Sequence, residues 1–409
     1  MTYPTAPPRL FGDAYAARPH EAIEQLRSLG PVAWAEIDEG VHALVVTSHR
    51  AALDLLHDTA TYSKDARLWW ALNNGHIPPN SPVLALMAWR PSLLYADDAT
   101  HQRLRVAMDD CLGRIDLHEL EEIVRRHAAT LISRVAPSGE VDVMADYADT
   151  VPLLAFADLL GCPEDVGVRL VKACQGVINA GPGAGLAAQD LIGCLAEVVA
   201  LKRQQPGRDI TTWMLTHHAQ LTDEELLNQL FVVVGAGTIP TAAWIGQSVR
   251  LLLSDEQYSS TLAGGAVTVR RAMEQTLRTH SPMANFSVHF ARRDTILHGI
   301  QIPARVPVMI SHQAANTDPA LPAHARGARD HLAWSAGPHR CPAVGPATRI
   351  AQVAVETILD QLWAMHLTEE SVPNRPGPFH QCPIAVHATF KPATAAALIA
   401  AAPSPGGTA

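Results

Sequence analysis

Trp334–Ala343 reads Trp-Ser-Ala-Gly-Pro-His-Arg-Cys-Pro-Ala and places one cysteine, Cys341, just before a predicted helix. Gly337 can adopt the backbone angles of a tight turn that other residues avoid, so this segment can fold backbone N–H groups toward the sulfur. After the cysteine, apolar residues recur at helical spacing: Val344, Ala347, Ile350, Ala351, Ala354 and Ile358. Because the N-terminus of a helix favours negative charge, the pattern predicts a thiolate at Cys341.

A thiolate in such a turn is suited to haem iron, to which it donates electron density that favours O–O cleavage. A lone buried cysteine is more often an inert packing residue, so the surrounding sequence has to decide. The chain has six cysteines, and none of them forms a CxxC pair: Cys111, Cys162, Cys174, Cys194, Cys341 and Cys382. Neither a zinc site nor a disulfide framework is therefore predicted, and the other five cysteines are expected to be packing residues.

Composition describes a globular protein of 409 residues, with 48% hydrophobic residues to build a core. The N-terminus lacks a basic region followed by an apolar run, and the apolar run 230–246 is shorter than the ~20 residues that span a bilayer. We therefore expect a cytoplasmic protein without a membrane anchor. A net charge of −9 without a block of basic residues makes nucleic acid an unexpected partner.

Hydrophobic periodicity predicts a mainly α fold with small β-sheets. The chain is expected to form a single domain over 1–409, with a disordered tail at 403–409, because no internal repeat or Gly/Ser-rich linker divides it. The predicted helices are 19–29, 50–56, 99–111, 117–135, 147–160, 164–180, 186–205, 222–253 and 267–279. The predicted strands are 32–37, 41–46, 287–290, 295–297, 301–302, 306–310 and 384–390.

Two charged pairs lie one helical turn apart on these predicted helices. Glu274 and Arg278 share one face of their helix, and His101 and Arg105 share a face of theirs. Taken alone, either pair is more often a solvated surface pair that adds little stability. Together with the cysteine segment, His101 and Arg105 are candidates for binding one anionic group.

With these elements in this order, the chain resembles a soluble bacterial cytochrome P-450, a haem-thiolate monooxygenase, over nearly its whole length. The resemblance implies the cytochrome P-450 fold, haem b as cofactor and Cys341 as the axial ligand of its iron. His101, Arg105 and His339 match residues that bind the haem propionates. Glu274, Arg278 and Arg326 match a structural Glu-Arg-Arg triad, and Asn316–Pro319 resembles the family's NRDP segment.

Several positions depart from the family pattern. Trp334, Ser335 and Ala343 replace a Phe and two Gly residues around the cysteine, which is expected to tune haem binding rather than to abolish it. His289 stands where an Arg commonly contacts a propionate, so this contact is expected to be weaker or titratable.

The largest departure lies in the long central helix, which begins at a capping box formed by Thr222 and Glu225. Val234–Thr241 aligns with the family's A-G-x-(Asp/Glu)-Thr-Thr, in which Ala236 and Gly237 lie against the haem. The alignment puts Ile239 and Pro240, followed by Thr241, at the catalytic acid and alcohol positions that deliver protons during oxygen activation. Proline inside a helix also removes an N–H and can free a carbonyl or admit a water.

Three interpretations of this loss remain open. Water or a polar group of the substrate replaces the relay, and regioselective hydroxylation continues. Alternatively, the enzyme uses peroxide, although peroxygenases of the family pair this proline with an Arg that Ile239 cannot replace. In the third interpretation, which we favour, substrate radicals couple with each other to form C–C or C–N bonds. The chain looks most like actinobacterial members that couple or dimerise tryptophan-containing cyclodipeptides, the diketopiperazines of secondary metabolite biosynthesis.

The resemblance also implies a substrate pocket and a redox partner. Positions that face substrate in the family fall on Trp89, Val232, Gly235, Ala236, Asn285, Ser287 and Gln381. The small residues leave room for a flat bicyclic substrate, the amides can bind lactam groups, and the absence of Arg or Lys argues against a carboxylate. Electrons are expected from a separate ferredoxin and ferredoxin reductase. A haem-binding sensor or scaffold without catalytic activity is the alternative of another class.

Overall fold

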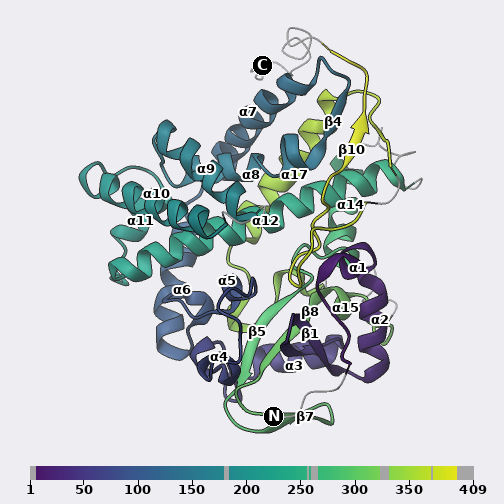
Figure 1. Cartoon of the computed structure of the whole chain (residues 1–409). Coiled ribbons are helices and arrows are strands. Elements are labelled where there is room, and N and C mark those ends of the chain that lie inside the picture. Colours follow the sequence, from purple (N-terminus) through teal and green to yellow (C-terminus); the bar gives the residue numbers. More distant parts are fainter. Residues whose placement is uncertain are drawn as a thin grey trace.

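Helices dominate the chain, and its strands form small sheets, as the sequence predicts (Figure 1). The structure, a computed structural model, describes residues 6–178, 184–255, 258, 266–322, 331–369 and 372–393. The α-helices are α1 (Gly12–Ala17), α2 (Pro19–Leu29), α3 (His49–His57), α4 (Trp70–Asn73), α5 (Leu84–Met87), α6 (Asp98–Gly113), α7 (Leu117–Val135), α8 (Val151–Leu159), α9 (Glu164–Ile178), α10 (Ala184–Gln204), α11 (Ile210–Leu215), α12 (Asp223–Ser254), α14 (Ala266–Thr279), α15 (His312–Asn316) and α17 (Val344–Gln361). Short helical turns are η1 (Ala66–Leu68), η2 (Leu93–Tyr95), η3 (Val143–Ala148), η5 (Leu332–Trp334) and η6 (Gly337–His339).

The largest sheet has five strands in the order β1-β2-β8-β5-β3. Only the β2–β8 pair is parallel among its neighbours. Successive residues of β2 alternate between two hydrophobic clusters, with Val41, Ala43 and Val45 on one side and Leu44 and Val46 on the other. Both faces of this sheet are therefore covered. The strands are β1 (Val32–Asp38), β2 (Val41–Val46), β3 (Tyr62–Ser63), β4 (Glu140–Asp142), β5 (Asn285–Ala291), β6 (Thr295–Leu297), β7 (Ile300–Ile302), β8 (Pro307–Ser311), β9 (His366–Leu367) and β10 (His387–Thr389).

Helix α12 crosses the middle of the molecule, between the sheet and the other long helices (Figure 1). The predicted capping box at its start is present, because the Thr222 side chain accepts from Glu225 N–H and the Glu225 side chain accepts from Thr222 N–H. Its length and composition would allow a membrane span, but half of its most apolar window is buried inside the protein. α12 is therefore described best as the central core helix.

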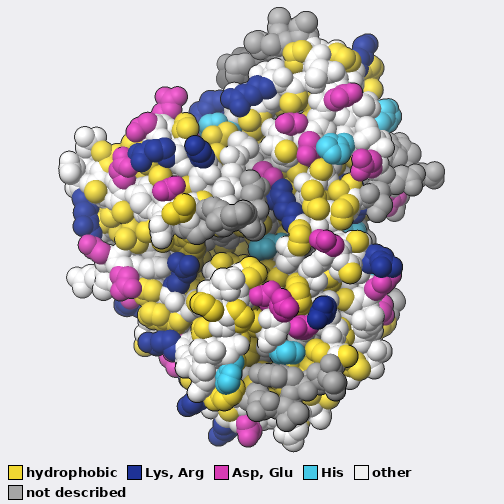
Figure 2. Space-filling model, in the orientation of Figure 1, with side chains coloured by type: hydrophobic (Ala, Val, Ile, Leu, Met, Phe, Trp, Pro, Cys, Tyr) yellow, Lys and Arg dark blue, Asp and Glu magenta, His cyan; other side chains and the backbone are white. Residues whose placement is uncertain are grey.

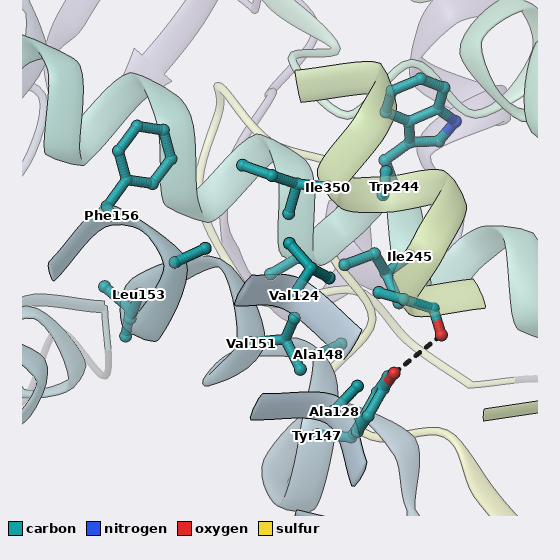
Figure 3. Packing of buried hydrophobic residues seen from close by; sticks show 14 of the residues in the cluster. Val124, Ala128, Tyr147, Ala148, Val151, Leu153, Phe156, Trp244, Ile245 and Ile350 are labelled. Carbon is teal, nitrogen blue, oxygen red and sulfur yellow. Dashed lines mark hydrogen bonds between the residues drawn. The ribbon is translucent and has the colours of Figure 1, made fainter. Parts of the chain in front are cut away.

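The largest hydrophobic cluster packs α12 against α7, α8 and α17 (Figure 3). Trp244 and Ile245 of α12 are buried there beside Ile350 of α17. The buried Tyr147 hydroxyl donates to the Ala354 carbonyl at 2.7 Å and ties η3 to α17. α17, the helix that follows Cys341, is thus anchored in the same core as the central helix.

At Gly237, α12 lies close against α8. A Cβ atom at this position would lie 2.2 Å from Cζ of Phe156, a buried ring of α8. Because the ring is enclosed by the core, it has little room to move aside. The side of α12 at Gly237 is consequently in contact with α8, which a cofactor-binding role for Gly237 did not predict.

Most predicted elements agree with the structure to within two residues at each end, and two of them differ by more. The helix predicted at 147–160 is divided, because α8 begins anew at Val151 with Pro152 in its first turn. The strand predicted at 384–390 is shorter and covers only His387–Thr389. The end of helix 164–180 and the tail at 403–409 lie outside the described residues.

Replacing Gly237 by Ala is expected to lower the free energy of unfolding by about 1–3 kcal/mol, because the new methyl group overlaps the Phe156 ring. Gly193→Ala in α10 is the matched control. A Cβ there meets nothing within 4 Å, so the change is expected to be neutral or to stabilise by up to about 1 kcal/mol. Denaturant unfolding of both variants provides the measurement. Equal stability of the two variants would show that the contact is not tight.

Candidate functional site

The cysteine segment is a tight turn held by its own backbone. The Cys341 N–H donates to the Trp334 carbonyl at 2.9 Å, and the Arg340 N–H donates to the Gly337 carbonyl at 3.1 Å. Gly337 has φ +66°, and a Cβ on it would lie 2.2 Å from the Leu56 carbonyl oxygen. The predicted need for glycine is confirmed, and the turn is pressed directly against the end of α3.

Ser335 lies in backbone space that almost only glycine occupies, with φ +59° and ψ −170°. Its hydroxyl is 3.3 Å from the hydroxyl of Ser287, which in turn is 3.1 Å from Nε2 of His312. This strained serine stands where the resemblance predicts a glycine. The Ser287 hydroxyl, which is expected to face substrate, links β5 and α15 to the cysteine segment.

The environment of the Cys341 sulfur contains both favourable and unfavourable influences on its charge. Burial raises the pKa of the thiol, while an N–H···S hydrogen bond from Ala343 and the positive charges of Arg105 and Arg340 oppose this rise. α17 begins at Val344, just beyond the cysteine, as predicted. The N–H group and the two guanidinium groups are the features that favour a thiolate.

Arg105 of α6 reaches the same turn. Its Nη1 donates to the carbonyl oxygens of Pro338 at 3.0 Å and Arg340 at 2.6 Å, and its Nε lies 2.8 Å from Asp109 Oδ1. Arg105 therefore holds the cysteine turn through its backbone, a role that the sequence did not predict. These contacts occupy part of its guanidinium group.

His101 and His339 are brought together as predicted, with ring centroids 4.0 Å apart. His101 Nε2 and His339 Nδ1 are both buried, and neither has a hydrogen-bond partner among the described residues. Burial is the main reason that the pKa of each ring lies below its usual value, and Arg105 and Lys64 lower both further. Two neutral imidazoles thus face each other with unused nitrogen atoms.

Lys64 is a member of this site that sequence reasoning missed. It is 5% exposed, and its Nζ donates to the Val288 carbonyl at 2.8 Å. Burial lowers its pKa to about 7, although Asp97 opposes the shift. Its charge lowers the pKa of His101, His289 and His339, so these groups share one neighbourhood. No sequence motif marks Lys64. It follows the two-residue strand β3, which reaches the site only by pairing with the distant strand β5 at Tyr62 and Ser63.

His289, on β5, is completely enclosed. Its Nδ1 lies 2.6 Å from the Ser287 carbonyl, which fixes the proton on this nitrogen and leaves Nε2 as the other polar atom. Burial holds its pKa well below the usual value. We call Lys64, His101, Arg105, His289 and His339 the basic cluster.

The basic cluster fits haem b. The unpartnered ring nitrogen atoms of His101 and His339, together with the ammonium group of the buried Lys64, form a donor set for anionic oxygens, and haem carries two propionate carboxylates. Arg105 and His339 connect this cluster to the Cys341 turn, since Arg105 binds that turn and His339 is part of it. The residues present are thus those needed to hold the iron at one point and the propionates at another.

Two further segments named in the sequence analysis, the helix that carries Glu274 and Arg278 and the segment at Asn316, contact the chain just before the cysteine turn. Glu274 Oε2 lies 3.2 Å from Nε2 of His331, which is at the start of the turn, and Arg278 follows Glu274 by one helical turn. Arg326 lies outside the described residues. Asn316 accepts from Leu332 N–H at 2.6 Å and donates to Ser281 at 3.0 Å, so it joins the end of α14 to the cysteine segment.

The middle of α12 presents an open side. A Cβ at Gly235 meets nothing within 4 Å, and Ala236 is exposed although it lies at the centre of the longest helix. Val232, Ile239 and Pro240 are partly buried, and Thr241 is buried. The helix continues through Pro240, which has no N–H for the carbonyl of Ala236.

The remaining predicted substrate residues lie in different surroundings. Trp89 is 37% exposed, and the Arg67 guanidinium lies 4.6 Å from its ring centroid. Asn285 donates through Nδ2 to the Tyr15 hydroxyl and to the Pro378 carbonyl, while its Oδ1 lacks a described partner. Gln381 is buried with an unpartnered Oε1. The two amides come from adjacent segments, since Asn285 N–H donates to the Phe379 carbonyl.

Asp110, His217 and His218 gather elsewhere with ligand atoms within 4.8 Å of one another. His217 Nδ1 accepts from Ala219 N–H, so the proton of this ring is on Nε2, which faces Asp110 at 3.1 Å. A metal would need that Nε2 lone pair. The hydrogen bonds therefore favour a structural histidine over a metal ligand.

No family model matches the chain. The 2-hydroxy-5-methyl-1-naphthoate 7-hydroxylase of Streptomyces carzinostaticus is 23% identical over 371 residues, which cover 87% of this chain and 90% of the relative. The cytochrome P450 monooxygenase PikC of Streptomyces venezuelae is 28% identical over 367 residues, which cover 86% of this chain and 85% of the relative. Both alignments therefore extend over most of each chain.

Solved structures with the same fold cover nearly the whole chain. CYP154C4 from Streptomyces sp. ATCC 11861, with bound testerone, has a TM-score of 0.85 at 24% identity and covers 93% of this chain and 98% of its own. Cytochrome P450 CYP109Q5 from Chondromyces apiculatus has a TM-score of 0.81 at 20% identity, and the match covers 94% of this chain and 98% of the CYP109Q5 chain. The predicted fold is confirmed, and haem b is the cofactor that it implies. The chain thus has the cytochrome P450 fold, and the sequence relatives it resembles over most of its length include a cytochrome P450 monooxygenase.

Proposed function

We propose that this chain is a haem-thiolate oxidase of natural-product biosynthesis, with Cys341 as the axial ligand. The observation that carries the proposal is the joining of the cysteine turn to the basic cluster through Arg105 and His339. When bound, haem b with a thiolate ligand supplies oxygen activation. Ala343 N–H and the charges of Arg105 and Arg340 stabilise the negative sulfur.

The basic cluster is assigned to the two propionates. Lys64 delivers a positive charge on the β5 side, where His289 replaces the arginine expected from the family. His101 and His339 offer nitrogen atoms that no described residue uses. Arg105 contributes chiefly by donating to the carbonyl groups of Pro338 and Arg340, which fixes the position of the cysteine turn relative to the basic cluster.

The open side of α12 is assigned to the substrate. Gly235 and Ala236 leave space there, and Val232 lies one turn earlier on the helix. Ile239 and Pro240 provide neither an acid nor an alcohol. Because Pro240 lacks an N–H, the carbonyl of Ala236 is available to hold a water or a substrate N–H group, and this carbonyl takes the place of the missing side chains.

For the reaction we favour radical oxidative coupling of tryptophan-containing cyclodipeptides, with C–C or C–N bond formation. Coupling removes one hydrogen from each partner, and dioxygen leaves as two waters after taking two further electrons and protons by way of the redox partner. The absence of an acid–alcohol pair at 239–240 supports this proposal under the hypothesis that altered proton delivery lengthens the lifetime of a substrate radical. The unpartnered oxygens of Asn285 and Gln381 are acceptors suited to lactam N–H groups.

Regioselective hydroxylation is the second candidate, and a relative that is named a hydroxylase favours it. In that case, water bound at the Ala236 carbonyl would supply the protons. The family implies a small-molecule substrate and redox partners, for which we propose a ferredoxin and a ferredoxin reductase in the cytoplasm. A haem-binding sensor or scaffold without catalytic activity is the alternative of another class. Detection of substrate turnover would exclude it.

Replacing Cys341 by Ala is expected to abolish the thiolate-type Soret band of the reduced carbon monoxide complex, because the variant lacks the sulfur of the turn that Arg105 and His339 join to the basic cluster. The matched control is Cys162→Ala, since Cys162 is also a partly buried free cysteine. The control should keep the wild-type band. A thiolate-type band in the Cys341 variant would contradict the assignment of the ligand.

Replacing Lys64 by Met is expected to accelerate haem loss to apomyoglobin by about tenfold, because one buried charge-assisted contact with a propionate disappears. Lys172→Met is the control, since Lys172 is exposed on α9. Identical rates of haem loss for wild type and Lys64→Met would rule out the contact.

In the haem-free protein, Lys64→Met is also expected to change how the free energy of unfolding depends on pH. The pKa of Lys64 is lowered to about 7 from 10.5, so between these values the unfolded chain binds the additional proton. This group therefore makes the unfolding free energy of the wild type rise with pH through that window. The stability advantage of Lys64→Met should be largest near pH 7 and shrink toward pH 10. His101, His289, His312, His339 and Asp97 surround Lys64 in both proteins, so the difference isolates the lysine.

If coupling depends on the missing relay, restoring both relay side chains with Ile239→Glu and Pro240→Thr is expected to shift products from coupling toward hydroxylation. The readout is the product mass with a tryptophan cyclodipeptide: a coupled product is lighter than the sum of its parts by two hydrogens, and a hydroxylated one gains an oxygen. An unchanged product ratio would remove the link between the relay and the reaction type.

A further inference from the structure

Residues 88–92 connect α5 to η2 and cross the central helix. The Leu93 N–H donates to Oε1 of the buried Gln229 of α12 at 3.0 Å, which fixes the end of this segment on the helix. The guanidinium carbon of Arg90 lies 4.6 Å from the ring centroid of Phe231, two residues farther along α12. Hydrophobic side chains gather around α5 and α12 on this face of the molecule (Figure 2).

Two polar groups of this segment have unmet hydrogen bonds. Nε of Arg90 and Oγ of Ser92 are both buried without a described partner, and Ser92 is 1% exposed. No carboxylate among the described residues pairs with Arg90. A buried donor without an acceptor is unfavourable, so an acceptor that enters here recovers the lost hydrogen-bond free energy.

Arg67 provides an internal comparison. Its guanidinium also lies 4.6 Å from an aromatic centroid, that of Trp89, but it forms an ion pair with Asp65 at 2.7 Å. The two arginines therefore share an aromatic contact, whereas only Arg67 has its charge neutralised by a carboxylate of the described chain. Arg90 retains donors for a ligand.

Arg90 also lies beside the open side of α12. Phe231 and Gly235 are four residues apart, so they share one face of the helix and are about 6 Å apart along its axis. Gly235 has open space around its Cβ position, and Ala236 is exposed. An oxygen atom of a molecule in that space comes within reach of a side chain as long as arginine.

We propose that Arg90 and Ser92 form a substrate subsite that binds an acceptor oxygen, either the carbonyl of a lactam or a carboxylate. This inference rests on the proposed function, because it assigns the open side of α12 to the substrate. It adds an arginine to a lining whose expected positions hold no Arg or Lys. The guanidinium group donates to the oxygen, Ser92 adds a second donor, and Phe231 supports the guanidinium from its other side.

The test uses the holoenzyme and three matched probes: indole-3-carboxamide, indole-3-carboxylate and 3-methylindole, which has no acceptor oxygen. Binding is measured from the haem spectral shift during titration. Wild type is expected to bind at least one oxygen-bearing probe about tenfold more tightly than 3-methylindole. Arg90→Met should abolish this preference, Ser92→Ala should reduce it, and the control Arg67→Met should keep it.

Each outcome separates the subsite from the proposed function. A preference for the carboxamide over the other two probes supports a neutral carbonyl ligand, as a cyclodipeptide would provide, and equal preference for the carboxamide and the carboxylate supports the subsite for either oxygen. A preference for the carboxylate alone supports the subsite and overturns cyclodipeptides as substrates. Wild-type preferences in both Arg90→Met and Ser92→Ala, with a normal thiolate-type band, overturn the subsite and leave the proposed function standing. Ser92→Ala tests the subsite independently if Arg90→Met fails to fold.

Discussion

The contact between the backbone of Gly337 and the carbonyl of Leu56 determines where Cys341 can lie. An added Cβ would overlap that carbonyl by more than an ångström of normal contact distance, so the turn can approach α3 only at a glycine. Arg105 then holds the carbonyl groups on either side of His339. The sulfur is thus positioned by main-chain atoms and one guanidinium group, and the neighbouring side chains are free to differ from those of relatives.

The basic cluster shows how positive charge is concentrated inside a protein whose net charge is −9. Lys64, α6, β5 and the cysteine turn each contribute to it, and burial shifts every histidine of the cluster toward its neutral form. Such a group of buried donors is unfavourable without an anion. A dianionic cofactor therefore adds to the stability of the surrounding fold as well as to its chemistry.

The sequence predicted the elements that depend on local patterns. Helices 19–29 and 117–135 have the predicted bounds, and the capping box of α12 and the positive φ of Gly337 follow from residues close in the chain. Lys64 could not be predicted, since a two-residue strand that pairs with a distant one brings it to the site. His331 beside Glu274 and Ser287 beside Ser335 also depend on long-range packing. The prediction of one helix at 147–160 overlooked a local signal, because Pro152 in this run favours the start of a new helix at α8.

Pro240 has a consequence for how this helix can be studied and how it can evolve. The group that it releases, the carbonyl of Ala236, belongs to the main chain, so no side-chain replacement at 236 deletes it. Alanine scanning of the pocket would pass over this acceptor without detecting it. Control of the carbonyl resides four residues away, where any residue other than proline returns an N–H to the helix. The residue at position 240 of α12 thus determines whether the carbonyl of Ala236 is free to accept a hydrogen bond.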